Sequence, residues 1–215
     1  QGLTMKLYTY YRSSAAYRVR IALNLKGIEH QQVAVNLFTR EEELESYKQI
    51  NPQSMVPVLE HNGNLFFQSM AILEYLEELH SENPILPVNR IERAQVRALS
   101  NIIACDIHPL NNLRILKYLG DKFNASEEGQ ADWYRHWIEQ GFQAFEDHIE
   151  HFTDGQFCFS RKPGMADILL IPQVYNARRF EVDMSQYPLI SGIEKHCLTL
   201  DAFARAQPEN QPDAV

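Results

Sequence analysis

Hydroxyl side chains stand at two places where the sequence passes from a strand pattern to a helix pattern. Ser13 and Ser14 precede the first helical stretch, and Ser69 follows Gln68 at the start of a later one. The first turn of a helix presents unpaired backbone N–H groups and a partial positive charge, so hydroxyls placed there help to hold an anion. Serine is also a preferred capping residue, and capping alone would explain either pair. The two pairs therefore offer anion binding, with helix capping as the simpler alternative.

A third stretch, residues 51–58, places Val56-Pro57 directly before a short apolar run. Proline is tolerated at the start of a strand, and a cis bond at this point would expose a backbone edge. The sequence alone leaves the isomer of Pro57 open.

The elements that must position these residues alternate between strand and helix. We expect strands over residues 6–10, 30–35, 58–60 and 65–68, with one helix ending at Gly27 and another starting at Ser69. Asn62-Gly63 favours a tight hairpin turn between the last two strands. The order βαβαββα predicts a thioredoxin-like fold, in which the three polar stretches meet at one edge of the sheet and form a groove of peptide size.

The pattern changes beyond Ser81, where a connector with two prolines leads into helical periodicity. We expect helices over residues 96–110, 133–152, 166–180 and 190–200, with almost no strand pattern among them. The sequence thus predicts an α/β domain over residues 5–82 and an all-α domain over residues 90–215.

Composition narrows the classes of function. Of 215 residues, 45% are apolar, and no run approaches the roughly 20 apolar residues of a membrane span. A formal net charge of -8 disfavours binding to nucleic acid. Three separated cysteines and eight histidines show no metal-ligand spacing, so we expect neither a disulfide framework nor a metal site. A soluble protein of the reducing cytoplasm fits this composition best.

A wider set of motifs resembles one protein family along nearly the whole chain. The matching stretches are Ser13-Ser14 with Arg18 to Leu23, Asn51-Pro52 with Val56-Pro57, Gln68-Ser69 with Glu74 to Glu78, Asp106 to Asn112, Gly141-Phe142, Met165 to Asp167 and Pro172 to Phe180. In this order they resemble the zeta class of glutathione transferases.

That resemblance implies a glutathione transferase fold, glutathione as cofactor and a homodimer. It also implies cis-trans isomerisation of a small unsaturated dicarboxylic acid, with glutathione transferase activity. Maleylacetoacetate, converted to fumarylacetoacetate in tyrosine and phenylalanine breakdown, is the first expectation for the substrate. Maleylpyruvate of gentisate breakdown is the alternative, and a non-catalytic glutathione-fold binding protein is a third reading, since a fold does not fix a function.

The resemblance also implies roles for particular residues. Ser14 would face the cofactor's thiol, Arg179 would face the second substrate, and Ser13 would share the catalytic site. The residues implied in glutathione binding are Ser13, Ser14, Arg18, Val56, Gln68, Ser69, His108, Asn112 and Arg114. Arg114, Arg178 and Arg179 are the candidates for the substrate carboxylates, since the guanidinium fork suits them.

Purely structural roles are the alternative for His108 and for the Arg178-Arg179 pair. A lone histidine such as His108 is more often a packed residue than a catalyst, and Arg178-Arg179 is also typical of the solvated end of an amphipathic helix.

Two positions depart from the pattern of the family. Ala15 replaces the cysteine that usually follows the two serines. We expect activity to survive, because the nucleophile is the cofactor's sulfur. Gly164 stands where a serine or threonine usually precedes Asp167, so a reciprocal capping box would lack its hydroxyl.

Overall fold

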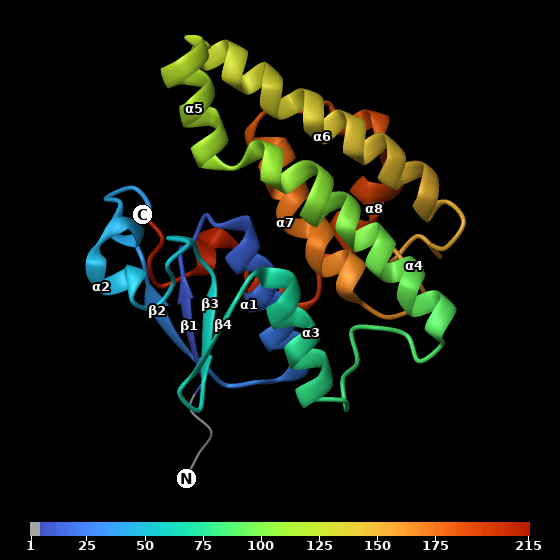
Figure 1. The fold of residues 1–215 in the computed structure, drawn as a ribbon. Helices are drawn as coiled ribbons and strands as arrows, with labels where there is room; N and C mark the ends of the chain where they lie inside the picture. The colour runs from blue at the N-terminus through green and yellow to red at the C-terminus, as the bar shows by residue number, and fades with distance from the viewer. Residues whose placement is uncertain (1–4) are drawn as a thin grey trace. The chain divides into compact units, whose positions relative to one another are not determined.

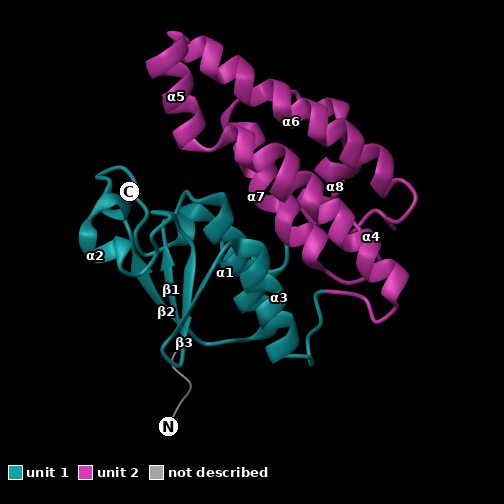
Figure 2. Ribbon diagram, viewed as in Figure 1, with its two compact units in different colours: residues 1–85, 198–215 teal, residues 86–197 magenta. Residues whose placement is uncertain are grey.

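The computed structural model describes residues 5–215, and these form two compact units. The described part of the first unit comprises residues 5–85 and Leu198–Val215, and the second unit comprises Leu86–Cys197 (Figure 2). Within the described residues no helix is both long enough and apolar enough to cross a membrane.

A four-stranded mixed sheet forms the centre of the first unit. Its order is β2-β1-β3-β4, with β1 parallel to β2 and antiparallel to β3, which pairs antiparallel with β4. Figure 1 shows α1 and α3 on one side of the sheet and α2 on the other. The elements are β1 (Met5–Thr9), α1 (Ser14–Lys26), β2 (Gln31–Ala34), α2 (Glu45–Lys48), β3 (Val58–His61), β4 (Asn64–Phe67) and α3 (Ser69–Leu79), with a short 3-10 turn η1 (Glu41–Glu43) before α2.

The predicted strands and helices of this unit are confirmed to within a few residues at each end. Strand β1 alternates buried and half-buried residues, so that one face packs under the helices, as the period of two requires. Gly27 ends α1 in the left-handed conformation, with φ 66°, as the sequence predicts. On the other face, Tyr47 of α2 packs with Val56 and Val58.

A buried ion pair holds the ends of α1 and α3 together. Lys26 Nζ donates to Glu77 Oε2 at 2.9 Å and to the carbonyl oxygens of His80 and Asn83, and both charged side chains are buried. Glu77 Oε2 also accepts from the Ile85 N–H at 2.9 Å. These bonds fix the connector directly after α3, because a buried charge must keep its partners.

The C-terminal segment belongs to the first unit, whereas the sequence places it with the helical domain of residues 90–215. It contains α9 (Asp201–Ala204) and the 3-10 turn η5 (Pro208–Asn210). Arg20 Nε donates to the Ala206 carbonyl at 3.1 Å, and Asn24 Nδ2 donates to the Ala202 carbonyl at 2.9 Å. Periodicity predicts that this segment is helical but not which unit it packs against. The hydrogen bonds from the polar side chains of α1 determine that packing.

The second unit is entirely helical among its described elements. Helix α7 packs against α4 and α8, and α6 packs against α4, α5 and α8. Its elements are α4 (Arg90–Asn101), the π-helical turn η2 (Ile102–Ile107), the 3-10 turn η3 (His108–Asn111), α5 (Leu113–Phe123), α6 (Glu127–Ile149), α7 (Met165–Arg179), the 3-10 turn η4 (Met184–Gln186) and α8 (Pro188–Cys197).

Two features of this unit differ from the expected helices. The helix expected over residues 96–110 is α4 followed directly by the π and 3-10 turns. These turns continue the helical path without a break, so the apolar residues still recur in a pattern typical of one helix. Helix α5 lies in a stretch for which the sequence pattern predicts no helix. Asn112 starts it by accepting from the Arg114 N–H at 3.1 Å.

Asp167 organises the start of α7, most of whose residues are buried. Its Oδ2 accepts from the Gly164 N–H at 2.8 Å and its Oδ1 from the Cys158 N–H at 2.8 Å. Gly164 has no hydroxyl to donate or accept in return, so one half of the capping box is present, as the sequence predicts. Burial raises the pKa of the Asp167 carboxyl from 3.8 to about 6, although both N–H donors favour the charged form.

This raised pKa predicts how stability changes with pH. Between about pH 4 and pH 6 the folded protein keeps a proton on Asp167 that the unfolded chain has released, so rising pH favours unfolding. The free energy of unfolding, expressed as wild type minus Asp167→Asn, should fall across that interval and stay level above it. Urea titrations of both proteins at several pH values measure the difference. A difference that rises with pH would contradict the assignment.

Candidate active site

Three segments of the first unit, which we call its three corners, meet at one end of the sheet. They are Ser13-Ser14 before α1, Val56-Pro57 before β3 and Gln68-Ser69 after β4. The strand register pairs Tyr8 with Val58 and Val58 with Phe67. The end of β1, the beginning of β3 and the end of β4 are therefore neighbours. The segments that follow or precede them carry the serine pair before α1, the Val56-Pro57 bond and the Gln68-Ser69 pair, so the convergence expected from the sequence is present.

At the first corner the two serines have different tasks. Ser13 is the N-cap of α1, and its Oγ accepts from the Ala16 N–H at 3.2 Å. Ser14 is the first helical residue and is buried, with 7% of its surface exposed. Capping therefore accounts for the hydroxyl of Ser13, while Ser14 places a second hydroxyl at the positive end of the helix.

A buried guanidinium links the first corner to the third. Arg18 Nη1 donates to Ser69 Oγ at 3.1 Å, and the two residues are only 2% and 6% exposed. Arg18 lies four residues after Ser14 and therefore on the same face of α1, and helical side chains lean toward the N-terminus. A positive charge is thus buried beside the starts of both α1 and α3, which favours an anionic ligand there.

Gln68 connects the third corner to the loop before β3. Its φ of 70° lies in the region that favours glycine, and its exposed side chain donates from Nε2 to Gln53 Oε1 at 2.8 Å. Backbone strain of this kind gathers at ligand sites, where the surrounding structure maintains it. Sequence reasoning missed Gln53, because its pairing with Gln68 depends on the hairpin register.

The Val56-Pro57 peptide bond is cis, which settles the isomer. The loop before it is held by two side chains that donate to the Met55 carbonyl, Tyr47 Oη at 2.7 Å and Asn51 Nδ2 at 2.9 Å. Both side chains fix the path of the backbone just before Val56. Tyr47 is a second residue that sequence reasoning missed.

In the second unit, His108 opens the 3-10 turn directly after the π turn and is half-buried. Gly141 of α6 lets this turn approach closely, since a Cβ at that position would lie 2.2 Å from Ile107 Cδ1. Asn112 caps α5 through its Oδ1, and the Arg114 side chain is exposed. The structure thus gives Asn112 a capping role.

The two adjacent arginines at the end of α7 differ in their partners. Arg178 Nε donates to both carboxylate oxygens of Glu194, at 2.9 and 3.0 Å, so its charge is already neutralised. Arg179 is exposed, and its Nη1 lies 3.5 Å from Asn176 Oδ1. The ion pair with Glu194 gives Arg178 a structural role, while Arg179 forms no ion pair with a carboxylate of the described residues.

Two of the three cysteines are buried, and the third, Cys105, is exposed and lies in the second unit. Burial raises the pKa of the Cys158 and Cys197 thiols, which keeps both protonated and unreactive. The described residues hold no group of three or more His, Cys, Asp or Glu side chains that could bind a metal ion. The three corners themselves carry hydroxyl and amide side chains and no thiol.

Comparisons with known proteins agree with this geometry. Residues 3–78 match the family model described as the N-terminal domain of glutathione S-transferase. A Vibrio cholerae protein named as a probable maleylacetoacetate isomerase is 46% identical, over 99% of each chain. The holo structure of a bacterial maleylpyruvate isomerase, described as a zeta-class glutathione S-transferase, is 44% identical with a TM-score of 0.95 and covers 98% of this chain and 100% of its own. The chain belongs to the zeta class of the glutathione transferase family.

A second solved structure bears on the ligand of this zeta-class transferase. It is a maleylacetoacetate isomerase from Anaeromyxobacter dehalogenans with glutathione bound in its active site. It is 40% identical, with a TM-score of 0.90, and each chain is covered completely. The fold class predicted from the sequence, a thioredoxin-like domain followed by a helical one, is confirmed for this family member.

Proposed function

We propose that this transferase is a glutathione-dependent cis-trans isomerase that converts maleylacetoacetate to fumarylacetoacetate. The observation that carries the proposal is the buried Arg18–Ser69 pair beside the hydroxyl of Ser14, at the starts of two helices. Relatives at more than 40% identity over nearly the full chain carry the names of such isomerases.

The residues of the first unit fit glutathione, a tripeptide with carboxylates at its ends and a thiol in its middle. Gln68 and Ser69, with the charge of Arg18 behind them, would hold the γ-glutamyl carboxylate. The backbone of Val56 beside the cis bond would pair with the cysteinyl unit. Ser14, at the N-terminus of α1, would then face the thiol.

When bound, glutathione would supply a thiolate nucleophile for reversible addition to the cis double bond, which is the chemistry that permits rotation. A free thiol with a pKa of about 8.5 is only a few per cent ionised at neutral pH. Lowering that pKa by about two units requires roughly 2.7 kcal/mol. One or two hydrogen bonds to a charged group, at about 1.5–3 kcal/mol each, supply this amount, so Ser14 and the helix start are sufficient.

The second unit would contribute the groups for the substrate, which is a dianion near neutral pH. Arg179 is the candidate for a carboxylate, because Arg178 is neutralised by Glu194. His108, Asn112 and Arg114 would complete the glutathione side of the site. The capping bond of Asn112 leaves its Nδ2 group available for such a contact.

Maleylpyruvate is the second candidate substrate, since a solved relative at 44% identity carries the name maleylpyruvate isomerase. Both acids present a cis double bond between carbonyl groups and two carboxylates. The ratio of kcat/KM values for the two acids, measured side by side, decides between them.

We also propose that the protein works as a homodimer in the cytoplasm. The edge strand β4 exposes Leu65 and Phe67, by 40% and 55%, which leaves apolar surface for a partner. A mass in solution equal to that of the single 25.0 kDa chain would contradict the dimer.

Replacing Ser14 with alanine tests the role of this residue. Turnover should require glutathione, and Ser14→Ala should lower kcat/KM by about 10- to 150-fold, the equivalent of one lost charge-assisted hydrogen bond. Ser126→Ala is the matched control, because Ser126 also stands at a helix start, where its Oγ accepts from the Gly129 N–H at 3.1 Å. The control should lose at most some stability. If Ser14→Ala kept wild-type kcat/KM with glutathione still required, the hydroxyl would have no role in catalysis.

A further inference from the structure

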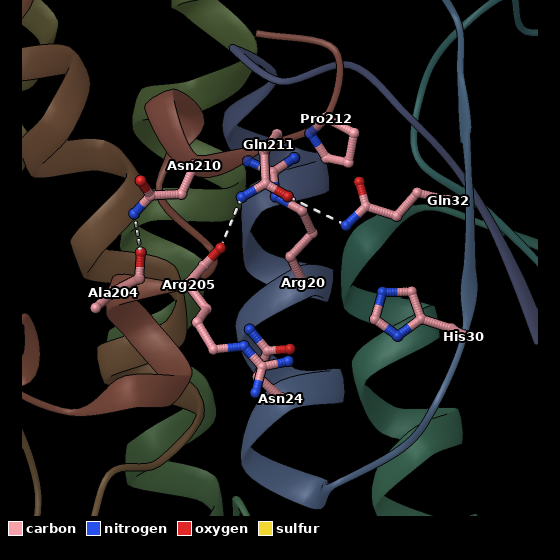
Figure 3. A pocket seen from close by; sticks show the side chains of 9 residues that line it. All are labelled: Arg20, Asn24, His30, Gln32, Ala204, Arg205, Asn210, Gln211 and Pro212. Carbon is pink, nitrogen blue, oxygen red and sulfur yellow. Dashed lines mark hydrogen bonds between the residues drawn. The ribbon is translucent and has the colours of Figure 1, made fainter.

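A cavity of about 430 Å³ lies in the first unit, apart from the three corners. Figure 3 shows its lining residues, which come from α1, from the start of β2 and from the C-terminal segment. No residue assigned above to glutathione or substrate is among them.

The cavity lies on the opposite face of α1 from the glutathione residues. Two residues along a helix correspond to a rotation of about 200°, so Arg18 and Arg20 point in nearly opposite directions. Arg18 contacts Ser69 of α3, and Arg20 contacts Ala206 in the C-terminal segment. The two positive charges therefore serve different sites.

The charge of the lining is opposite to that of the whole protein. Two arginines line the cavity and no acidic side chain does, although the chain carries a net charge of -8. Burial lowers the pKa of His30, which also lines it, so this imidazole adds no charge near neutral pH. The acids nearby have partners of their own. Asp213 accepts from the Tyr11 N–H at 3.0 Å, and Asp201 pairs with Arg205 at 3.2 Å. That last pair is exposed, so it holds Arg205 only weakly and leaves it able to bind another anion.

Arg20 carries a buried charge that only uncharged oxygens contact directly. Its guanidinium donates to the carbonyls of Ala206, Tyr10 and Tyr11 and to Thr9 Oγ1, at 3.0 to 3.4 Å. Burial lowers the pKa of Arg20 to about 10, with Asp213 acting in the other direction. An anion in the neighbouring cavity would compensate this charge.

Amide side chains hold the walls of the cavity in place. Gln32 Nε2 donates to Gln211 Oε1 at 3.1 Å, and Gln211 Nε2 donates to the Arg205 and Gln207 carbonyls. Asn210 Nδ2 donates to the Ala204 carbonyl at 2.7 Å. The C-terminal segment is thus tied to β2 and to itself, and the cavity exists before any ligand arrives, which lowers the cost of binding.

We propose that this cavity binds a small dicarboxylate. Its volume is at the lower end of the range for small-molecule sites, about 300–1,000 Å³. The exposed guanidinium of Arg205, on the C-terminal wall, can donate to one carboxylate. The buried charge of Arg20, on the α1 wall, attracts a second carboxylate through its field, because its N–H groups are largely used by protein oxygens. Two separated carboxylates therefore match this lining better than the single compact charge of a phosphate ion. The exposed side chain of Arg205 would contact the ligand directly, and the buried Arg20 would supply a positive charge at a fixed position.

Calorimetric titration of the full chain with succinate tests this site, and inorganic phosphate serves as the competing oxyanion. We expect saturable succinate binding that is at least tenfold weaker, about 1.4 kcal/mol, in Arg205→Gln. The melting temperature without succinate should be unchanged in this variant, because Arg205 is exposed. Lys117→Gln is the matched control, since it also removes an exposed i,i+4 ion pair, and it should bind succinate like the wild type.

A third variant separates this cavity from the substrate site. Arg179→Gln should retain succinate binding, because Arg179 does not line the cavity. The proposal is overturned if succinate shows no saturable binding, if Arg205→Gln binds it as tightly as the wild type, or if Arg179→Gln abolishes binding. Tighter binding of phosphate than of succinate would overturn the ligand class.

Discussion

A buried guanidinium joins the beginnings of two helices in this protein. Arg18 reaches from the second turn of α1 to the hydroxyl of Ser69, the first residue of α3. Transferring a guanidinium from water to the protein interior costs free energy. Hydrogen-bond partners in fixed positions offset this desolvation cost. Because both helix starts add their own partial positive charges, the local field favours an anion in a protein whose net charge is strongly negative.

The rest of the first unit can be understood as the frame for this charge. The sheet register brings the three corners to one end, and the Lys26–Glu77 pair fixes α1 and α3 at their far ends. Tyr47 and Asn51 fix the loop that leads to the cis Val56-Pro57 bond. A hydroxyl at Ser14 is then held in a defined place, and pre-positioned groups of this kind stabilise a developing charge without reorganising.

Much of this arrangement could be predicted from local sequence. The helix end at Gly27, the hairpin turn at Asn62-Gly63 and the serines at the helix starts depend on neighbouring residues, and all appear in the structure. The family resemblance added the zeta class, which the comparisons confirm.

Features that depend on distant partners could not be predicted. The Gln53–Gln68 bond requires the register of two strands, and the pairing of Arg178 with Glu194 requires the packing of α7 against α8. Residues 198–215 join the first unit through side chains of α1 that lie about 180 residues earlier in the chain. Helical periodicity contains no information about any of these contacts.

Stabilisation of a bound thiolate by the start of α1 can be tested directly. The most direct measurement is a spectrophotometric pH titration of glutathione bound to the protein, followed through the ultraviolet absorbance of the thiolate. We expect a pKa about two units below the value of about 8.5 for a free thiol. A bound thiol that ionises at the same pH as free glutathione would contradict it.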